Sequence, residues 1–433
     1  MTVPTSSYLL ERAWVGGAVR DDVLVEVADG RFASVTPGAT SPDAVRLAGL
    51  TVPGLANAHS HAFHRALRGR TQRGRGTFWT WREQMYAVAE RLDPDSYLAL
   101  ATAVYREMAA AGTTTVGEFH YLHHQRDGTP YDDPNAMGHA LVEAARVAGV
   151  RLSLLDTCYL SSGFGAPVEG VQRRYSDGDV DGWAERLARF EPDGDHVHVG
   201  GAFHSVRAVA PRDMARYAAN PLHVHLSEQP QENQDCLAVY GATPTRLLAD
   251  HGVLGPRTTV VHATHLTDED VDLLGSTRTH VCFCPTTERD LGDGVGPSRE
   301  LRDAGARLTL GSDSHAVIDP FEEMRAVELD ERLASRRRGT WTTADLLAAA
   351  TVTGHASLGF ADAGALAVGQ RADLVTLDTT SVRTAGTGAD EHTAVWAAGA
   401  ADVVSVVADG VLLDLDREGV GRDLDRTIRS LLP

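Results

Sequence analysis

Residues 50–66, "LTVPGLANAHSHAFHRA", join a short apolar run, typical of a buried strand, to three closely spaced histidines. His59 and His61 are two residues apart, and His64 follows three residues later. Because alternate side chains of a strand point to the same face, His59 and His61 can hold one ion together while Ser60 points away. The stretch therefore predicts a strand that ends in a pair of metal ligands, with His64 beyond the strand end.

Runs of the same apolar, β-branched character recur along the middle of the chain. The strand at 50–59 is followed by seven others, at 113–119, 150–157, 196–203, 221–228, 258–264, 279–285 and 306–313. Between them lie segments with helical periodicity, such as 97–112, which Gly112 ends as a C-terminal cap. Eight strand-then-helix units predict an α/β fold, a (β/α)₈ TIM barrel over residues 51–364.

The two ends of the chain have a different pattern. Residues 1–50 and 365–433 contain short strand-like runs around Asp-Gly turns, in "VLVEVADGRFASV" and "VVSVVADGVLL". Neither end is long enough to form a convincing core alone. We expect both termini to pack together as one small composite β-domain beside the barrel.

The composition excludes several classes of function. A formal net charge of −19 over 433 residues argues against nucleic acid and anionic membranes as partners. All 40 basic residues are arginine. The absence of lysine excludes Schiff-base and pyridoxal phosphate chemistry, a phosphate-loop lysine and a metal pair bridged by a carbamylated lysine.

Other features of the composition bear on the cell compartment. The four cysteines are too sparse for a disulfide scaffold and suggest a reducing environment. The first residues lack the basic and apolar pattern of a signal peptide, and the sequence has no uninterrupted apolar run of about 18 residues. We therefore expect a cytoplasmic protein with no membrane partner.

The other candidate site residues stand at the ends of predicted strands. His225 ends the fifth strand with Glu228 three residues later, His262 ends the sixth, and Asp313 ends the eighth. Barrel enzymes carry their active sites at these carboxyl ends. A single histidine in a strand is usually a core residue, but five residues at four strand ends favour a metal site. Three imidazoles and a carboxylate suit zinc with room for a water molecule.

The order of these residues resembles that of the metal-dependent amidohydrolase superfamily. It has a His-X-His pair, then a histidine, a second histidine and an aspartate. The spacing from His225 to Glu228 resembles the deaminase branch, which uses one divalent ion. The resemblance implies that His59, His61, His225 and Asp313 bind that ion, which we expect to be zinc.

Within the superfamily, the chain resembles the formimidoylglutamate deiminases. The stretches that carry this resemblance are "NAHSHAFHRA", "TFWTWREQMY", "GEFHYLHH", "FHSVRAVAP", "HVHLSEQPQE", "VHATH" and "GSDSH". The resemblance implies hydrolysis of N-formimino-L-glutamate to N-formyl-L-glutamate and ammonia, in histidine degradation. It also implies that Asp313 accepts a proton from water, Glu228 protonates the imino nitrogen and His262 stabilises the developing charge.

A small acidic substrate of this kind needs partners for two carboxylates. Arg82, Tyr121, His204 and Arg207 follow the first, second and fourth strands, in predicted loops at the catalytic end. Arginine binds carboxylate in a bidentate manner, so these residues can form a cradle for the dianion. His64 is a further candidate. The family is expected to have glutamine there, and both side chains can donate a hydrogen bond to a carboxylate.

Two alternatives remain open at this point. A deaminase with the same metal residues could act on a cyclic amidine such as guanine or a pterin, with aromatic stacking in place of two arginines. A zinc-binding protein without catalysis is the other alternative, which the presence of Glu228 and Asp313 disfavours. The sequence does not distinguish zinc from iron or manganese. We expect a homodimer.

Overall fold

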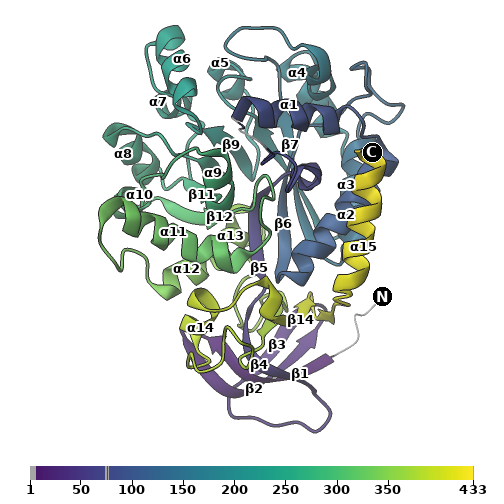
Figure 1. The fold of residues 1–433 in the computed structure, drawn as a ribbon, viewed down its shortest axis with the longest axis vertical. Coiled ribbons are helices and arrows are strands. Elements are labelled where there is room, and N and C mark those ends of the chain that lie inside the picture. The colour runs from purple at the N-terminus through teal and green to yellow at the C-terminus, as the bar shows by residue number, and fades with distance from the viewer. Residues whose placement is uncertain (1–5, 74–75, 77, 433) are drawn as a thin grey trace.

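The computed structural model describes residues 6–73, 76 and 78–432, and its larger sheet forms the predicted barrel. Its parallel strands are β5 (Leu55–Ser60), β6 (Thr113–His120), β7 (Arg151–Cys158), β8 (Val197–Phe203), β9 (Leu222–Leu226), β10 (Thr258–His262), β11 (His280–Phe283) and β12 (Arg307–Leu310). Each pairs with the next, and a parallel bridge from Ser60 to Asp313 joins the first strand to the segment after the last. The predicted (β/α)₈ fold is confirmed (Figure 1).

Helices surround this barrel. They are α1 (Phe78–Ala89), α2 (Pro94–Ala110), α3 (Ala136–Ala148), α4 (Val180–Ala188), α5 (Pro211–Met214), α6 (Pro230–Tyr240), α7 (Pro244–Asp250), α8 (Asp268–Ser276), α9 (Pro285–Leu291), α10 (Ser298–Ala304), α11 (Pro320–Ser335), α12 (Thr343–Ala350) and α13 (Val352–Ser357), with 3₁₀ helices η1 (Ala62–Leu67) and η2 (Gly170–Tyr175). Local chemistry sets several ends: Asp93 caps the backbone N–H of Ser96 at the start of α2, and Gly149 ends α3 with φ 75°.

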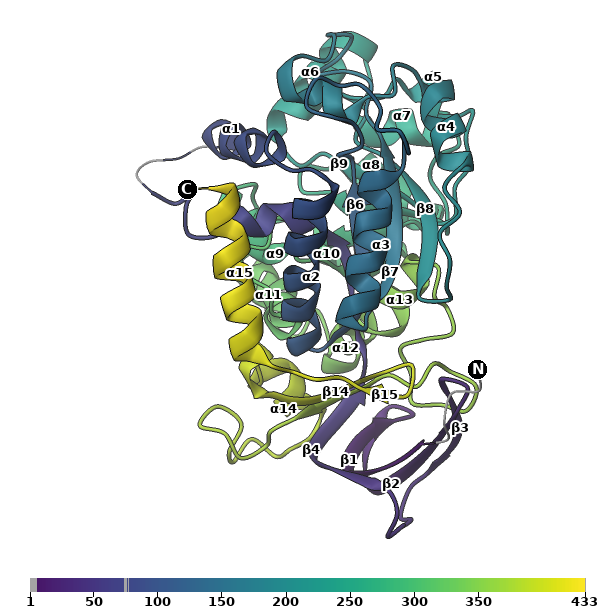
Figure 2. The ribbon, with the colours of Figure 1, turned by 90° about the vertical axis from the view of Figure 1, so that its right-hand side faces the viewer.

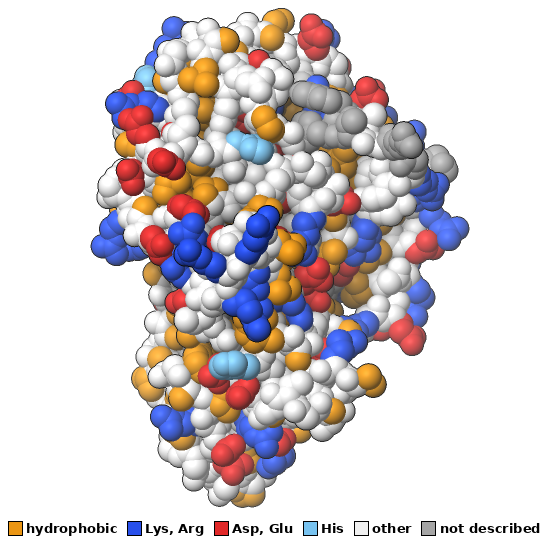
Figure 3. Space-filling model, turned by 60° about the vertical axis from the view of Figure 1, so that its left-hand side comes forward, with side chains coloured by type: hydrophobic (Ala, Val, Ile, Leu, Met, Phe, Trp, Pro, Cys, Tyr) orange, Lys and Arg blue, Asp and Glu red, His pale blue; other side chains and the backbone are white. Residues whose placement is uncertain are grey.

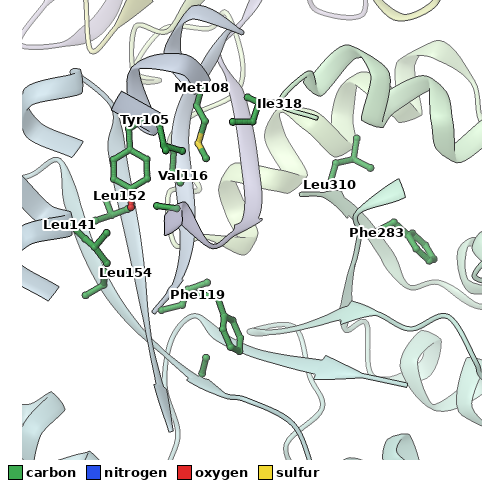
Figure 4. Packing of buried hydrophobic residues seen from close by; sticks show 14 of the residues in the cluster. Tyr105, Met108, Val116, Phe119, Leu141, Leu152, Leu154, Phe283, Leu310 and Ile318 are labelled. Atoms are coloured by element: carbon green, nitrogen blue, oxygen red, sulfur yellow. The ribbon is translucent and has the colours of Figure 1, made fainter. Parts of the chain in front are cut away.

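The barrel core lies between the strands and their covering helices. Tyr105 and Met108 of α2 pack with Leu141 of α3 in the same buried cluster as Val116 and Leu152 of the strands (Figure 4). All five side chains are fully buried. This packing fixes the strand ends against their helices and so holds the side chains that follow each strand in place.

The second sheet combines strands from both ends of the chain. Its order is β15 (Val411–Leu412), β14 (Val403–Ala408), β13 (Leu374–Leu377), β4 (Val45–Pro53), β1 (Ser6–Val15), β2 (Ala18–Ala28) and β3 (Arg31–Thr36). Asp29 and Gly30 connect β2 to β3, and Asp409 and Gly410 connect β14 to β15. All four have positive φ, as a two-residue hairpin turn that continues the strand twist requires.

The predicted run 50–59 divides into two strands around Gly54. The first part completes β4 of the terminal sheet, and the second is the barrel strand β5. A Cβ at position 54 would lie 2.4 Å from Oγ1 of Thr114, so only glycine allows the chain to pass from one sheet to the other here. The terminal sheet therefore extends three residues beyond the boundary expected at residue 50.

The two sheets are joined through a shared interior. Val375 and Leu377 of β13 belong to the barrel's core cluster. Arg151, at the start of β7, forms a buried ion pair with Asp373, which precedes β13, and a partly exposed one with Asp409, in the turn between β14 and β15. Burial alone would raise the pKa of Asp373, but the Arg151 guanidinium lowers it to about 2.

The C-terminal segment does not belong wholly to the terminal sheet. Helix α14 (Glu391–Trp396) and the 3₁₀ helix η3 (Ala400–Asp402) lead to β14, after which α15 (Arg417–Leu431) runs along α2 of the barrel (Figure 2). Leu424 and Leu431 of α15 are buried in the barrel's core cluster. The proposed division into residues 1–50 with 365–433 and residues 51–364 stays a prediction.

The surface carries charges of both signs. Figure 3 shows arginine side chains next to acidic ones across the middle of one face. Among the helices of the described residues, none combines the length and apolar character needed to cross a membrane.

Candidate active site

Four predicted ligands converge at the carboxyl end of the barrel. One side-chain atom each from His59, His61, His225 and Asp313 lies within 4.8 Å of the others, and all four residues are buried. Oδ1 of Asp313 is 3.3 Å from Nε2 of both His59 and His61. Ser60 points the other way, where its hydroxyl donates to Glu118 at 2.7 Å. This is the alternation that the strand pattern predicts.

The hydrogen bonds around the cluster prepare it for a cation. Nδ1 of His61 donates to the carbonyl of Phe119 at 3.0 Å, and Nδ1 of His225 donates to the carbonyl of His204 at 3.0 Å. With these protons on Nδ1, the Nε2 lone pairs of both rings face inward. Nε2 of His225 lies only 3.1 Å from Nε2 of His59. Burial lowers the pKa of His59 to about 4, so the ring is neutral. Converging neutral nitrogens and one carboxylate fit a divalent ion.

Unusual backbone angles occur where the strands end. Ser227, His262 and Asp313 have φ values of 49°, 72° and 39°. Non-glycine residues adopt these left-handed conformations at an energetic cost, and such strain collects at functional sites. Strand β12 ends at Leu310, and Asp313 lies beyond it, where it forms a single parallel bridge with Ser60. This position holds its carboxylate close to the His59 and His61 rings.

We refer to His59, His61, His225 and Asp313 together as the metal cluster. Beside it, His262 lies close to three carboxylates. Its Nε2 lies 3.9 Å from Glu228 and 4.0 Å from Asp313, and its Nδ1 lies 3.4 Å from Oε1 of Glu288. Burial alone would lower the pKa of His262, but these carboxylates together raise it well above its ordinary value. Glu228 is thus linked to the cluster through one imidazole.

A cavity of about 670 Å³, including its open mouth, adjoins the cluster. It is lined by His61, His64, Trp81, Arg82, Met85, Tyr86, Tyr121, Tyr159, Ser162, Tyr175, His204, Arg207, His225, Glu228, His262, Leu291 and Asp313. Each of the five predicted substrate-binding residues is in this wall. The structure therefore brings them to the same space as the metal cluster and Glu228.

Arg82 differs from the prediction in its local structure. We expected it in a loop, but it lies on helix α1, because residues 78–89 contain no glycine or proline to interrupt a helix. Its guanidinium is 5.7 Å from the centre of the Tyr86 ring. The predicted stretch "TFWTWREQMY" begins with Thr77, which lies outside the described residues, as do the side chains of Phe78 and Trp79.

His64 and Tyr121 form a pair in the wall of the cavity. Nε2 of His64 lies 2.9 Å from the Tyr121 hydroxyl, and the imidazole also packs edge-on against Trp81 with ring centres 5.1 Å apart. His64 is 2% exposed, and its Nδ1 has no hydrogen-bond partner among the described residues. One ring nitrogen of His64 is therefore buried and unpaired within the described part of the chain, while the other is bonded to Tyr121.

The sequence did not identify two acidic residues that contact the site. Glu288, on α9, holds His262 and accepts the backbone N–H of Cys284 at 2.9 Å. Glu118, on β6, accepts the N–H of Ala62 at 2.7 Å and supports the segment between His61 and His64. Burial raises the pKa of Glu118 to about 7. Glu288 follows the seventh strand by a few residues. That position, near the carboxyl end of a barrel strand, is the only feature of the sequence that could have indicated its place in the site.

A second group of potential ligands has another role. His120, His123 and Asp156 lie close together and are buried. The Asp156 carboxylate already accepts bonds from both terminal nitrogens of Arg186, at 2.7 and 2.9 Å, and from Trp183 at 2.9 Å. Because Arg186 supplies the positive charge, this cluster is a structural network.

Comparison with known proteins identifies the class to which this fold and site belong. The model of the amidohydrolase family matches residues 50–413, so the chain belongs to that family. A solved amidohydrolase from Brucella melitensis is 32% identical, with a TM-score of 0.89, and the match covers 99% of this chain and 100% of that one.

Two curated relatives indicate the kind of reaction. The chain is 38% identical over 392 residues to formimidoylglutamate deiminase from Pseudomonas aeruginosa, and the match covers 86% of each chain. It is 31% identical over 389 residues to 8-oxoguanine deaminase from the same organism, with 86% of this chain and 83% of that protein covered. The protein is an amidohydrolase-family deaminase, a hydrolase acting on carbon–nitrogen bonds.

Proposed function

We propose that the protein hydrolyses N-formimino-L-glutamate to N-formyl-L-glutamate and ammonia, a step of histidine degradation. The observation that carries this proposal is a cavity whose wall includes three of the four predicted metal ligands, His61, His225 and Asp313, together with Arg82 and Arg207. The substrate has a formimino carbon for hydrolysis and two carboxylates for the arginines. The similarity to the formimidoylglutamate deiminase from Pseudomonas aeruginosa supports the same substrate.

The cofactor of the proposed reaction is one zinc ion. His59, His61, His225 and Asp313 would hold it, since their donor atoms converge and two of the rings have their outer nitrogens bonded to carbonyls. When bound, such an ion supplies Lewis acidity and lowers the pKa of a water molecule toward neutrality. The chain contributes the proton transfers and the orientation of the substrate.

Residues around His262 carry out the proton transfers. Water adds to the formimino carbon while Asp313 accepts its proton, and His262 donates a hydrogen bond to the charge that develops on the oxygen. Glu228 places a proton on the terminal nitrogen. The proton that Asp313 took from water then passes to the same nitrogen, while the new hydroxyl group returns a proton to Glu228. The bond from carbon to that nitrogen breaks, ammonia leaves and the formyl group remains on glutamate. The 3.9 Å contact between Glu228 and His262 keeps these groups in one region.

The positively charged residues of the cavity bind the substrate. Arg82 and Arg207 each offer a guanidinium to a carboxylate, while Tyr121 and His204 supply further hydrogen-bonding groups. Burial and the nearby Arg207 cation lower the pKa of His204 well below its ordinary value, so this ring is neutral. His64, which lines the cavity, stands where glutamine is expected in formimidoylglutamate deiminases, and both side chains can donate a hydrogen bond to a carboxylate.

A cyclic amidine is the second candidate substrate, and one observation favours it. Aromatic side chains make up much of the cavity wall, including Trp81, Tyr86, Tyr121, Tyr159 and Tyr175. Such rings can stack on a purine or pterin, and the 8-oxoguanine deaminase similarity agrees with this. A cyclic amidine has no carboxylate to offer to the two arginines of the cavity wall, so we place it second.

Ammonia release distinguishes the two substrates. The metal-loaded protein is incubated with N-formimino-L-glutamate, N-formimino-L-aspartate, guanine and 8-oxoguanine, and ammonia is measured in each reaction. We expect rapid release from the glutamate compound, weaker release from the shorter aspartate compound, and none from the purines. Release from a purine without release from N-formimino-L-glutamate would show that the cyclic amidine is the substrate.

A further inference from the structure

Arg207 has a buried acidic partner behind the cavity. Its Nε lies 3.6 Å from Oε2 of Glu232. Glu232 stands in the first turn of α6, four residues after Glu228, and is 2% exposed. It does not line the cavity itself. The ion pair therefore connects the arginine of the cavity wall to a helix outside that wall.

The ion pair between Arg207 and Glu232 is not expected to stabilise the folded protein. Both carboxylate oxygens of Glu232 and Nε of Arg207 are buried, and among the described residues none of the three makes a hydrogen bond of ordinary geometry, although the backbone of Glu228 lies close enough to lower the pKa of Glu232. A carboxylate buried without hydrogen bonds costs free energy, and an apolar residue there would cost less. Burial raises the pKa of Glu232 to about 7, against the opposing effect of Arg207. The presence of glutamate here points to a role for its charge.

Arg207 also has an alternative location for its long side chain. Besides the cavity, it lines an adjoining open groove of about 1200 Å³, whose other walls include Phe164, Pro211 and Tyr240. An unrestrained arginine has several rotamers available, and ordering it opposes binding through lost entropy. The carboxylate of Glu232, on one side of the guanidinium, can determine whether the Arg207 side chain lies in the cavity or in the groove.

We propose that Glu232 is a positioning residue that holds the Nε edge of Arg207 and so leaves its terminal nitrogens for a substrate carboxylate. Guanidinium is planar with two edges, so one cation can serve Glu232 and a ligand at once. The ion pair also keeps Arg207 ordered before the substrate arrives, which reduces the entropy lost on binding. The substrate part of this inference rests on the proposed function, whereas the orientation of Arg207 does not.

Replacement of Glu232 by glutamine tests this role with little change of size. For the Glu232→Gln variant we expect KM for N-formimino-L-glutamate to rise about tenfold, as for loss of a close charged pair, and kcat to change little. Glu232→Asp keeps the charge and should restore most of the affinity. The control is Asp235→Asn, which removes an exposed carboxylate from the same helix and should leave both constants unchanged.

A double variant shows whether Glu232 acts through Arg207. In an Arg207→Met background, Glu232→Gln should produce no further rise in KM, because the group that it positions is absent. If the two effects on KM instead multiply in full, or if Glu232→Gln lowers kcat and leaves KM unchanged, the positioning role is wrong.

A crystallographic comparison needs no substrate. Structures of the unsubstituted protein and Glu232→Gln should show Arg207 in the cavity in the first and turned into the groove in the second. The same Arg207 position in both would overturn the inference. If the unsubstituted protein releases no ammonia from N-formimino-L-glutamate, the proposed function fails, but this comparison still decides what Glu232 does.

Discussion

The Glu228→Gln variant should lose about 10³-fold in kcat, the size expected for loss of a general acid. Glutamine keeps the shape of the side chain but cannot deliver a proton to the leaving nitrogen. Glu228 lies outside the group of four convergent ligands, so the variant should bind the same amount of metal. Steady-state ammonia release and metal analysis on the same sample measure both quantities.

A surface variant provides the comparison for this result. Glu269→Gln changes an acidic side chain that is 68% exposed on α8 and should leave kcat unchanged. Normal turnover in Glu228→Gln would exclude Glu228 as the proton donor. A matching loss of metal and turnover would instead show that Glu228 supports the metal cluster.

Arg207→Met should raise KM for N-formimino-L-glutamate about 10²-fold, because a charged hydrogen bond to a buried carboxylate is lost. Methionine retains much of the apolar stem of arginine. Glu232 then loses its cationic partner, but its pKa of about 7 allows it to take up a proton instead of remaining as a buried charge. Metal content and the melting temperature should therefore change little.

Arg212→Met is the control for this variant, since that side chain is 84% exposed on α5 and forms only a loose pair with Asp213. It should leave KM unchanged. If Arg207→Met reduced metal content while KM stayed constant for the loaded fraction, the assignment of Arg207 to a substrate carboxylate would be incorrect.

The sequence predicts the barrel and its metal cluster well because both depend on short-range patterns. The alternation of His59, Ser60 and His61 directly determines which side chains share a face. The carboxyl ends of parallel strands also meet at one side of a barrel, which brings His225 and Asp313 to the pair from distant parts of the chain.

Positions beyond the strand ends are harder to predict from sequence. Arg82 was expected in a loop because the segment after the first strand contains many polar residues, yet part of it is the helix α1. Glu232 and Glu288 lie on helices that follow strands, where an acidic residue usually faces solvent. Tertiary packing buries Glu232 against Arg207 and Glu288 against His262. No local sequence pattern predicts either contact. The predicted homodimer stays a prediction.

Metal titration tests the proposed one-metal deimination most directly. The protein is stripped with a chelator, zinc is returned in steps, and ammonia, N-formyl-L-glutamate and bound zinc are measured with N-formimino-L-glutamate as substrate. We expect the initial rate to rise in proportion to bound zinc and to level off at one ion per chain, with ammonia and N-formyl-L-glutamate formed in equal amounts. Full activity in the stripped protein, or formamide in place of ammonia, would contradict the proposed reaction.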